Sequence, residues 1–221
     1  MNAIRRHPER ARHELTDLYA VLDAAAVGTL ATVAADGTPW VVPMLYARIG
    51  DVVILHGSTG AGALRHARAG APAALSVMML DGIVVADNLF DSSANYRSAV
   101  VHGTLRDVGE EAEVSALEAM SDALVPGRST EVRATTRKER AATATCALTM
   151  DRWTVKVRDA PPTRPAVTTG GAWAGVVPLR TVADPPVPAA WIDSEAPVPD
   201  SVRRLVEGAA GFVTAAGDTG P

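Results

Sequence analysis

Three pairs of glycine and aspartate divide the first ninety residues into short apolar runs, and this spacing limits what the chain can fold into. The pairs are Asp36-Gly37, Gly50-Asp51 and Asp81-Gly82. Such pairs favour hairpin turns, because glycine adopts the positive φ that tight turns need. The pattern therefore predicts an antiparallel meander that continues as further hairpins. The expected strands are residues 29–34, 38–47, 52–55, 73–80, 83–86, 96–108 and 143–157.

Helical patterns interrupt these strands. Leu15, Leu18 and Leu22 recur at a spacing of three and four residues, and the segment 110–124 carries acidic residues in its first turn and Pro126-Gly127 after its end. Antiparallel strands interrupted by short helices indicate a mainly β fold, a small barrel with helices at its edges. The expected helices are residues 10–26, 63–69, 110–124 and 135–142.

Composition excludes several classes of function. The 21 basic and 25 acidic residues give a formal charge of −4, and no run of basic residues suggests a nucleic-acid groove. Cys146 is the single cysteine, which rules out an intramolecular disulfide and a cysteine-based metal cluster. No window has the apolar length of a membrane span or a signal peptide. We therefore expect a cytoplasmic protein without a metal site, a nucleic-acid partner or a membrane partner.

A glycine-rich loop follows the strand at 52–55 and leads directly into a short helix. Its sequence is His56-Gly57-Ser58-Thr59-Gly60-Ala61-Gly62. Glycines let the backbone approach a ligand, and the free amides and the dipole at a helix start favour an anion. The loop lacks the Lys-Ser/Thr of a nucleoside-triphosphate loop and the glycine order of a dinucleotide fingerprint. We expect it to bind a phosphate group.

The composition changes after residue 158. Proline and glycine dominate from residue 160 onward, and the segment 173–179 is the only firmly apolar part of this tail. We expect a barrel domain at residues 1–158 and, at 159–221, a mostly irregular extension that packs on the barrel or on a partner subunit. The sheet is expected to end at the last barrel strand, and the end of the tail to be disordered.

Several motifs follow one another in register between Arg5 and Leu179: GTLATVAADGTPWVVPMLYARIGDVVILHGSTGAGALRHARAGAPAALSVMMLDGIVVA, NYRSAVVHG, PGR, ERAAT, VKVR and WAGVVPL. In this combination they resemble the flavin-nucleotide-binding branch of the pyridoxamine 5′-phosphate oxidase superfamily, the FMN-binding split barrels. The resemblance implies a six-stranded antiparallel split barrel that forms a homodimer, with FMN bound at each end of the dimer interface.

The resemblance also implies which residues hold the cofactor. The flavin ring is expected along Val41, Val42 and Pro43, and the phosphate near Leu55, His56, Gly57 and Ser58, with amide donors from Thr59, Gly60 and Gly62. Family members often carry a Ser-Arg pair where this chain has Ala61-Gly62. Arg65, one helical turn further on, is a candidate to replace the missing guanidinium, and Arg97 and Arg128 are the alternatives. The departure leaves open weaker FMN binding or a different flavin-like ligand.

Four further residues have competing interpretations. Tyr96 and Arg97 interrupt an apolar strand, and they point either to a ligand pocket or to a salt bridge at the dimer interface. Lys156 shares one strand face with Arg158, which suggests an anionic neighbour or plain solvent exposure. Trp173 either closes over the flavin site of the partner or packs on the barrel.

His56 is the candidate catalytic residue. It could contact the flavin or its phosphate, protonate a small-molecule substrate, coordinate a haem iron, or only terminate its strand. The first hypothesis for function is an FMN-dependent oxidoreductase that transfers hydride from a reduced nicotinamide to a small organic acceptor. The alternatives are a non-catalytic flavin- or haem-binding protein for storage or sensing, and a reductase that uses a deazaflavin cofactor.

Overall fold

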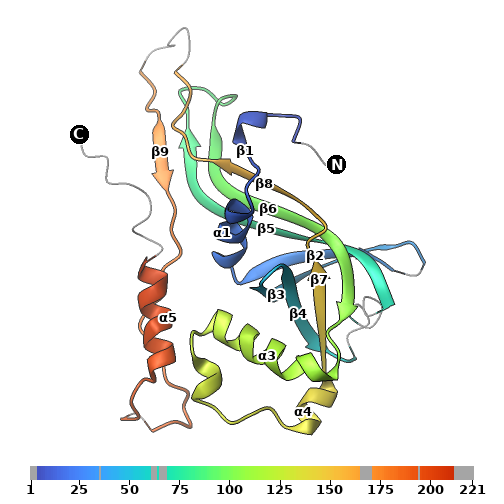
Figure 1. Ribbon diagram of the computed structural model, residues 1–221. Coiled ribbons are helices and arrows are strands. Elements are labelled where there is room, and N and C mark those ends of the chain that lie inside the picture. Colours follow the sequence, from blue (N-terminus) through green and yellow to red (C-terminus); the bar gives the residue numbers. More distant parts are fainter. Residues whose placement is uncertain are drawn as a thin grey trace.

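The computed structural model describes residues 4–34, 36–60, 64, 69–164, 171–193 and 195–211. In this part of the chain nine strands form one antiparallel sheet, and helices pack around it (Figure 1). The strands are β1 (Ala11–Arg12), β2 (Val27–Val33), β3 (Pro39–Ile49), β4 (Val52–Ser58), β5 (Ala69–Val85), β6 (Ser93–Asp107), β7 (Thr143–Thr149), β8 (Arg152–Arg158) and β9 (Gly175–Pro178). The helices are η1 (Pro8–Arg10), α1 (Leu15–Asp23), α3 (Glu110–Leu124), η2 (Arg128–Thr130), α4 (Arg137–Ala142) and α5 (Asp200–Gly211).

Six of the strands close into a ring. The order β5-β2-β3-β4-β7-β6 returns to its start because β6 also pairs with β5. The other edge of β6 is shared by two strands, since Tyr96 to His102 pair with β8 and Leu105 to Asp107 pair with β7. The barrel is thus split along β6, with β8 leaving the ring. The mainly β split-barrel class expected from the sequence is confirmed.

Gly103 lies where β6 changes its partner from β8 to β7. A Cβ at this position would overlap the backbone carbonyl oxygen of Thr149, at the end of β7. The Thr149 side-chain hydroxyl also accepts a hydrogen bond from the Thr104 amide at 2.9 Å, so a second contact holds β6 and β7 together at this crossing. Only glycine permits this approach of two backbones, so this position determines where the barrel splits.

The main core fills the inward side of the barrel and of β8. Leu18, Val21 and Leu22 of α1 join the inward side chains of the strands in this cluster. Burial raises the pKa of Tyr46, whose hydroxyl donates to the Leu22 carbonyl at 2.5 Å. A second, smaller cluster lies outside the ring, where α3 covers β3, β4 and β7.

Strand β5 differs from its prediction. The Asp81-Gly82 pair does not make a hairpin, because β5 continues through it with a register shift between Leu80 and Gly82. The inward residues are odd-numbered before the shift, as with Val77, and even-numbered after it, as with Val84. A bulge therefore replaces the expected turn. A Cβ on Gly82 would also lie 3.1 Å from the Val177 carbonyl oxygen of β9. Because Gly82 has no side chain, β9 can pair with β5 at this position.

Other boundaries also differ. The predicted strand 143–157 is two strands, because the chain turns at Met150 and Asp151 to take β8 out of the ring. The expectation that the sheet ends at residue 157 was wrong, since β9 of the tail pairs with β5. The predicted helix 10–26 is shortened to α1, while α3 has the predicted bounds. The predicted helix 63–69 falls almost wholly outside the described residues.

Replacing Gly103 with alanine is expected to destabilise the protein by at least ~3 kcal/mol, because neither backbone at the crossing can move without breaking ladder hydrogen bonds. Urea unfolding followed by circular dichroism measures this change. Gly208→Ala in α5 is the matched control, since nothing lies within 4 Å of a Cβ at that position. A loss at Gly103 no larger than at Gly208 would contradict the tight crossing.

Candidate functional site

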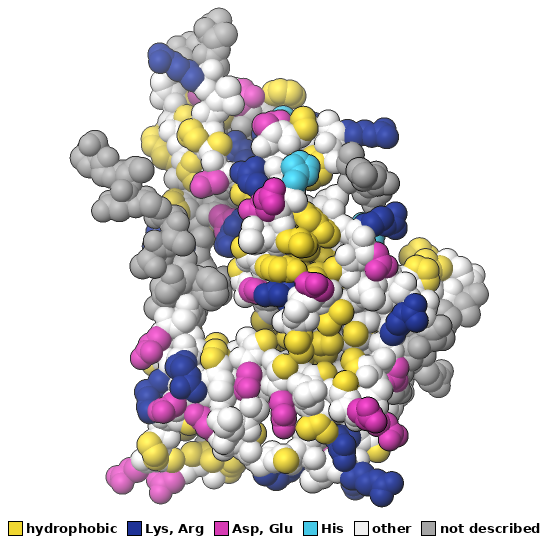
Figure 2. Space-filling model, viewed as in Figure 1, with side chains coloured by type: hydrophobic (Ala, Val, Ile, Leu, Met, Phe, Trp, Pro, Cys, Tyr) yellow, Lys and Arg dark blue, Asp and Glu magenta, His cyan; other side chains and the backbone are white. Residues whose placement is uncertain are grey.

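The outward side of β3, β2, β5, β6 and β8 carries many exposed apolar side chains; we call it the open face. Val41 is 60% exposed and Met78 is 64% exposed, and Val27 and Leu45 are also exposed. Figure 2, seen from the same side as Figure 1, shows further hydrophobic areas in the middle of the side that carries α1 and α3, with a small charged group between them. A contiguous apolar area of this kind on a single chain marks an interaction or ligand surface.

A groove of about 480 Å³ lies on the open face. One lateral row of residues crosses it, because the strand registers place Val41 opposite Ala31, Ala31 opposite Ala74, Ala74 opposite His102, and His102 opposite Arg152. The two alanines form a low floor between the valine on one side and the histidine and arginine on the other. The groove therefore combines a flat apolar base with one imidazole and one guanidinium.

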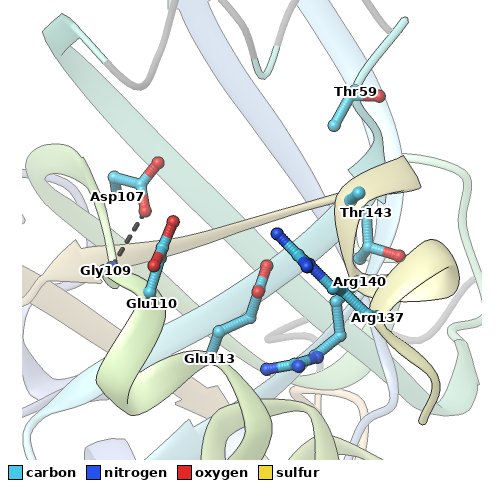
Figure 3. A pocket seen from close by; sticks show the side chains of 9 residues that line it. Thr59, Asp107, Gly109, Glu110, Glu113, Arg137, Arg140 and Thr143 are labelled. Atoms are coloured by element: carbon cyan, nitrogen blue, oxygen red, sulfur yellow. Dashed lines mark hydrogen bonds between the residues drawn. The ribbon is translucent and has the colours of Figure 1, made fainter.

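A second hollow, of about 350 Å³, lies on a different side of the barrel, beside the glycine-rich loop (Figure 3). Arg137 and Arg140 of α4 reach into it from one side, and Glu110 and Glu113 of α3 face them. Thr59, at the end of β4, completes the wall. The spacing of three residues puts both arginines on one face of their short helix.

A capping box fixes the start of α4. The Glu139 amide donates to the Thr136 hydroxyl at 3.3 Å, and the Glu139 carboxylate accepts from the Thr136 amide at 2.8 Å. Hydrogen bonds from Arg133 and then from Thr136 hold the pKa of Glu139 well below its usual range. These contacts orient α4, and in the described part of the chain the buried Nε of Arg140 has no hydrogen-bond partner.

The structure places the predicted phosphate residues at this second hollow or beside it. The Thr59 amide donates to the Ala142 carbonyl at 3.0 Å, and the Gly60 amide donates to the Ser58 hydroxyl at 3.2 Å. These two amides are therefore engaged within the protein and not directed at a ligand. Gly62 and Arg65 lie outside the described residues.

The residues just before the loop are less accessible. Leu55 belongs to the main core, and a Cβ on Gly57 would lie 2.5 Å from Leu64 Cδ1. His56 is half-buried on the outward side of β4, opposite Thr145 of β7. This is the side that α3 covers, so His56 does not line the groove of the open face.

The predicted flavin-ring residues lie on β3. Val41 and Pro43 point outward on the open face, and Val42 packs against the main core. Within one chain, Val41 and Thr59 line two separate hollows. The single ring-and-phosphate site expected from the sequence is thus not assembled as one pocket by the described residues of one chain.

Two of the remaining predicted residues, Arg97 and Lys156, have partners within the protein. Arg97 forms a bidentate pair with Asp81 of β5, at 3.0 and 2.8 Å, which raises the pKa of Arg97. Lys156 donates to the Arg6 carbonyl at 3.2 Å. Tyr96 is half-buried opposite Leu80. The expected anionic neighbour of Lys156 does not appear among the described residues.

Trp173 lies just before β9 and is largely exposed. Its side chain is 65% exposed and lies over Gly175, where a Cβ would approach the ring to 2.8 Å. The tail instead joins the barrel through β9 and through α5, where the buried Ser201 donates its amide to Glu131 at 2.9 Å. The exposure of Trp173 leaves its side chain available for contact outside its own barrel.

Sequence reasoning missed the arginines of both hollows, Arg137, Arg140 and Arg152, and the imidazole of His102. Arg137 and Arg140 lie on a short helix far from the glycine-rich loop in the sequence. The pairing of Thr143, at the start of β7, with Ser58 brings that helix beside the loop. The alternation of β6, with Val101 buried inward, could have placed His102 on the outward side. No sequence pattern indicates that Ala74 and Arg152 flank it.

The chain matches the family model of pyridoxamine 5′-phosphate oxidase over residues 14–157, more than half of its length. It therefore belongs to the pyridoxamine 5′-phosphate oxidase family. No curated protein matches the sequence. Among the described residues, no helix is long and apolar enough to cross a membrane, and no group of three or more acidic, histidine or cysteine side chains could hold a metal ion.

Solved structures show the same fold. The FAD and haem binding protein from Mycobacterium smegmatis is 40% identical, with a TM-score of 0.86 over 89% of this chain and 97% of that chain. The flavocytochrome Anf3 from Azotobacter vinelandii is 29% identical, with a TM-score of 0.84 over 91% and 94%. A putative 5-nitroimidazole antibiotic resistance protein from Bacteroides thetaiotaomicron, 16% identical with a TM-score of 0.57 over 66% and 86%, shares the fold alone.

The pairing of Arg97 with Asp81 is expected to stabilise the β5–β6 ladder by about 0.5–1 kcal/mol, a modest value because both side chains are partly exposed. A double-mutant cycle with Arg97→Gln and Asp81→Asn, followed by urea unfolding, measures this coupling. The pair accounts for Arg97 without a ligand. Zero coupling together with a loss of bound flavin in Arg97→Gln would instead assign Arg97 to the cofactor.

Proposed function

We propose that this protein is a redox protein that binds a flavin, FAD, together with haem. The main support is the relative named as an FAD and haem binding protein, which is similar over nearly the whole chain, and the similar flavocytochrome supports the same pair of cofactors. The proposal keeps the flavin chemistry expected from the sequence and prefers FAD to FMN. Haem, one of the alternatives raised by the sequence, becomes part of the proposal.

The residues around the second hollow suit the phosphate end of a flavin nucleotide. The observation that carries this assignment is the Nε of Arg140 beside the Ser58–Gly60 turn, a buried atom that has no hydrogen-bond partner among the described residues. A buried donor without an acceptor costs free energy, which a phosphate oxygen would recover. Arg137 adds a second guanidinium, and so the two arginines can replace the guanidinium that the Ala61-Gly62 segment lacks.

The groove of the open face suits a planar apolar group with acidic substituents. Its alanine floor offers a flat surface, and polar and charged side chains stand at one rim. A flavin would supply the electron-transfer chemistry, and this chain would bind it, orient it and limit its contact with water. We propose a reduced nicotinamide as electron donor and a small organic molecule as acceptor, in the cytoplasm.

The open face further supports a homodimer. Exposed apolar side chains from three neighbouring strands cover it, among them Val27, Leu45 and Met78. A second copy of the chain would bury them, and a two-fold arrangement would bring each open face against the other. In such a dimer the exposed Trp173 segment would be available to the partner subunit, as the family resemblance implies.

Replacing Arg140 with glutamine is expected to weaken FAD binding about ten- to a hundredfold, because a charge-assisted hydrogen bond to the phosphate is lost. Fluorescence titration of the apo-protein measures the dissociation constant. Lys138→Gln, on the same helix but outside the hollow, is the matched control. Riboflavin lacks the phosphate and should bind all three proteins equally. An equal loss for riboflavin would mean that Arg140 supports the fold only.

Placing glutamate on the open face at Leu45 and Met78 is expected to yield a monomer, because two charges would be buried without partners in the dimer. Light scattering at micromolar concentration measures the mass. Val182→Glu, an equally apolar and exposed site on the tail, should leave the dimer intact. A wild-type monomer, or a variant that remains dimeric, would show that the open face is not the interface.

A further inference from the structure

We propose that His102 would bind haem iron and that Arg152 would pair with a haem carboxylate, with the haem held in the groove of the open face. This inference rests on the haem part of the proposed function. The inference goes beyond that function because it names the two residues that would hold the haem. It also replaces His56, the histidine that the glycine-rich loop had suggested, with one from the middle of the sheet.

The strand registers bring the proposed ligands together. His102 of β6 stands opposite Ala74 of β5 on one side and opposite Arg152 of β8 on the other. The same row continues through Ala31 to Val41. Three steps of about 4.8 Å between strands give this row a width of roughly 14 Å from β3 to β6. A ring bound through the imidazole of His102 would extend from it over Ala74 and Ala31 of this row.

The side chains along the row leave space above the sheet. Ala31 and Ala74 rise only one carbon above the backbone, whereas Val33 and Val41, both more than half exposed, stand at the far end. A porphyrin is flat and largely apolar, so its burial on this floor would remove exposed hydrophobic surface from water. The small floor residues and the taller apolar edge thus match the shape of the group.

The orientation of His102 follows from its strand. Val101 is fully buried in the main core, so the next side chain along β6 points to the open face. Gly103 follows directly, and its tight crossing with Thr149 holds this part of β6 in place. An imidazole has two ring nitrogens, and in metal sites one binds the metal while the other is commonly held by a hydrogen bond. His102 does interact with another part of the chain.

Arg152 supplies the charge that haem carboxylates require. It begins β8 at the rim of the groove, and among the described residues no carboxylate forms an ion pair with it. An arginine can bind a carboxylate through two parallel hydrogen bonds, which orients as well as attracts it. Asp151 lies at the same rim, so the site is not uniformly positive.

His56 lacks these surroundings. It lies on the side of the barrel that α3 covers, with Ile54 of the same strand packed in the second cluster. The described residues around it form no groove with an apolar floor. A haem-binding experiment on variants of His102 and of His56 therefore distinguishes the two assignments.

The test is a titration of the full-length apo-protein with hemin, read by the Soret absorbance and by the electron paramagnetic resonance spectrum of the ferric iron. His102→Ala should weaken hemin binding by more than the roughly 10–100-fold typical of changes outside the metal ligands. Arg152→Gln should weaken it roughly threefold to tenfold, within the range of a partly exposed charge pair. His13→Ala and Lys156→Gln are the matched controls and should bind hemin like the wild type.

A second variant separates ligation from folding. His102→Gln keeps a polar side chain of similar size and tests the loss of the ligand without a cavity. His102→Ala leaves space for a free imidazole, so added imidazole should restore the Soret band and the spectrum of the ferric iron in that variant. Restoration supports His102 as the ligand. A folded His102→Gln protein that binds hemin like the wild type, or a folded His102→Ala protein that imidazole does not rescue, would overturn the assignment. Loss of the Soret band in His56→Ala alone would do the same.

The outcomes also distinguish this inference from the function on which it rests. If the wild-type protein gives no Soret band with hemin, the haem part of the proposed function fails. If the wild type binds hemin and His102→Ala loses flavin while keeping hemin, the groove holds the flavin ring, and only the present assignment is overturned. Flavin content is therefore measured on every variant from its absorbance.

Discussion

The approach of β6 to the end of β7 at Gly103 is the contact on which the architecture depends. One long strand serves two neighbours along the same edge, first β8 and then β7, and it can change neighbours only where no side chain separates the backbones. The ring of six strands closes on one side of this crossing, and β8 extends the sheet on the other. His102 and Arg152 lie on the β8 side, directly before the crossing. The groove of the open face is in this sense a product of the split.

The two hollows differ in polarity, and each suits a different one of the proposed cofactors. The hollow beside the glycine-rich loop is polar and contains opposed charges, with a guanidinium nitrogen of Arg140 buried and unpartnered in the described chain. The groove is mostly apolar, with its charge at one rim. A flavin nucleotide and a haem differ in the same way, since one carries phosphates on a flexible chain and the other carries two carboxylates on a flat ring. The open face adds a reason for two copies to associate, because it leaves large apolar side chains in water.

Several residues that looked like ligands in the sequence proved to have partners within the protein. Arg97 and Lys156 were singled out because a cation in an apolar strand needs a partner. That argument was sound, but it could not say whether the partner is a ligand, and the structure supplies Asp81 and the Arg6 carbonyl. The residues that form the proposed sites are instead flanked by residues of other strands, and the sequence around them does not show those neighbours. Ala74 has no functional signal of its own, and it matters only because it lies opposite His102.

The sequence by itself determined the fold class, the bounds of α3 and most of the strand positions, because turn residues and alternating burial are local properties of the chain. It also indicated the family, through motifs that stand in a fixed order. It did not determine that Asp81-Gly82 is a bulge, since a bulge and a hairpin turn use the same residues and only the pairing of β5 with β6 distinguishes them. The two hollows were likewise decided by tertiary structure alone. Their walls join residues far apart in the chain, such as Thr59 with Arg140 and Val41 with Arg152, and strand register, which places those residues together, is fixed by packing of the whole barrel.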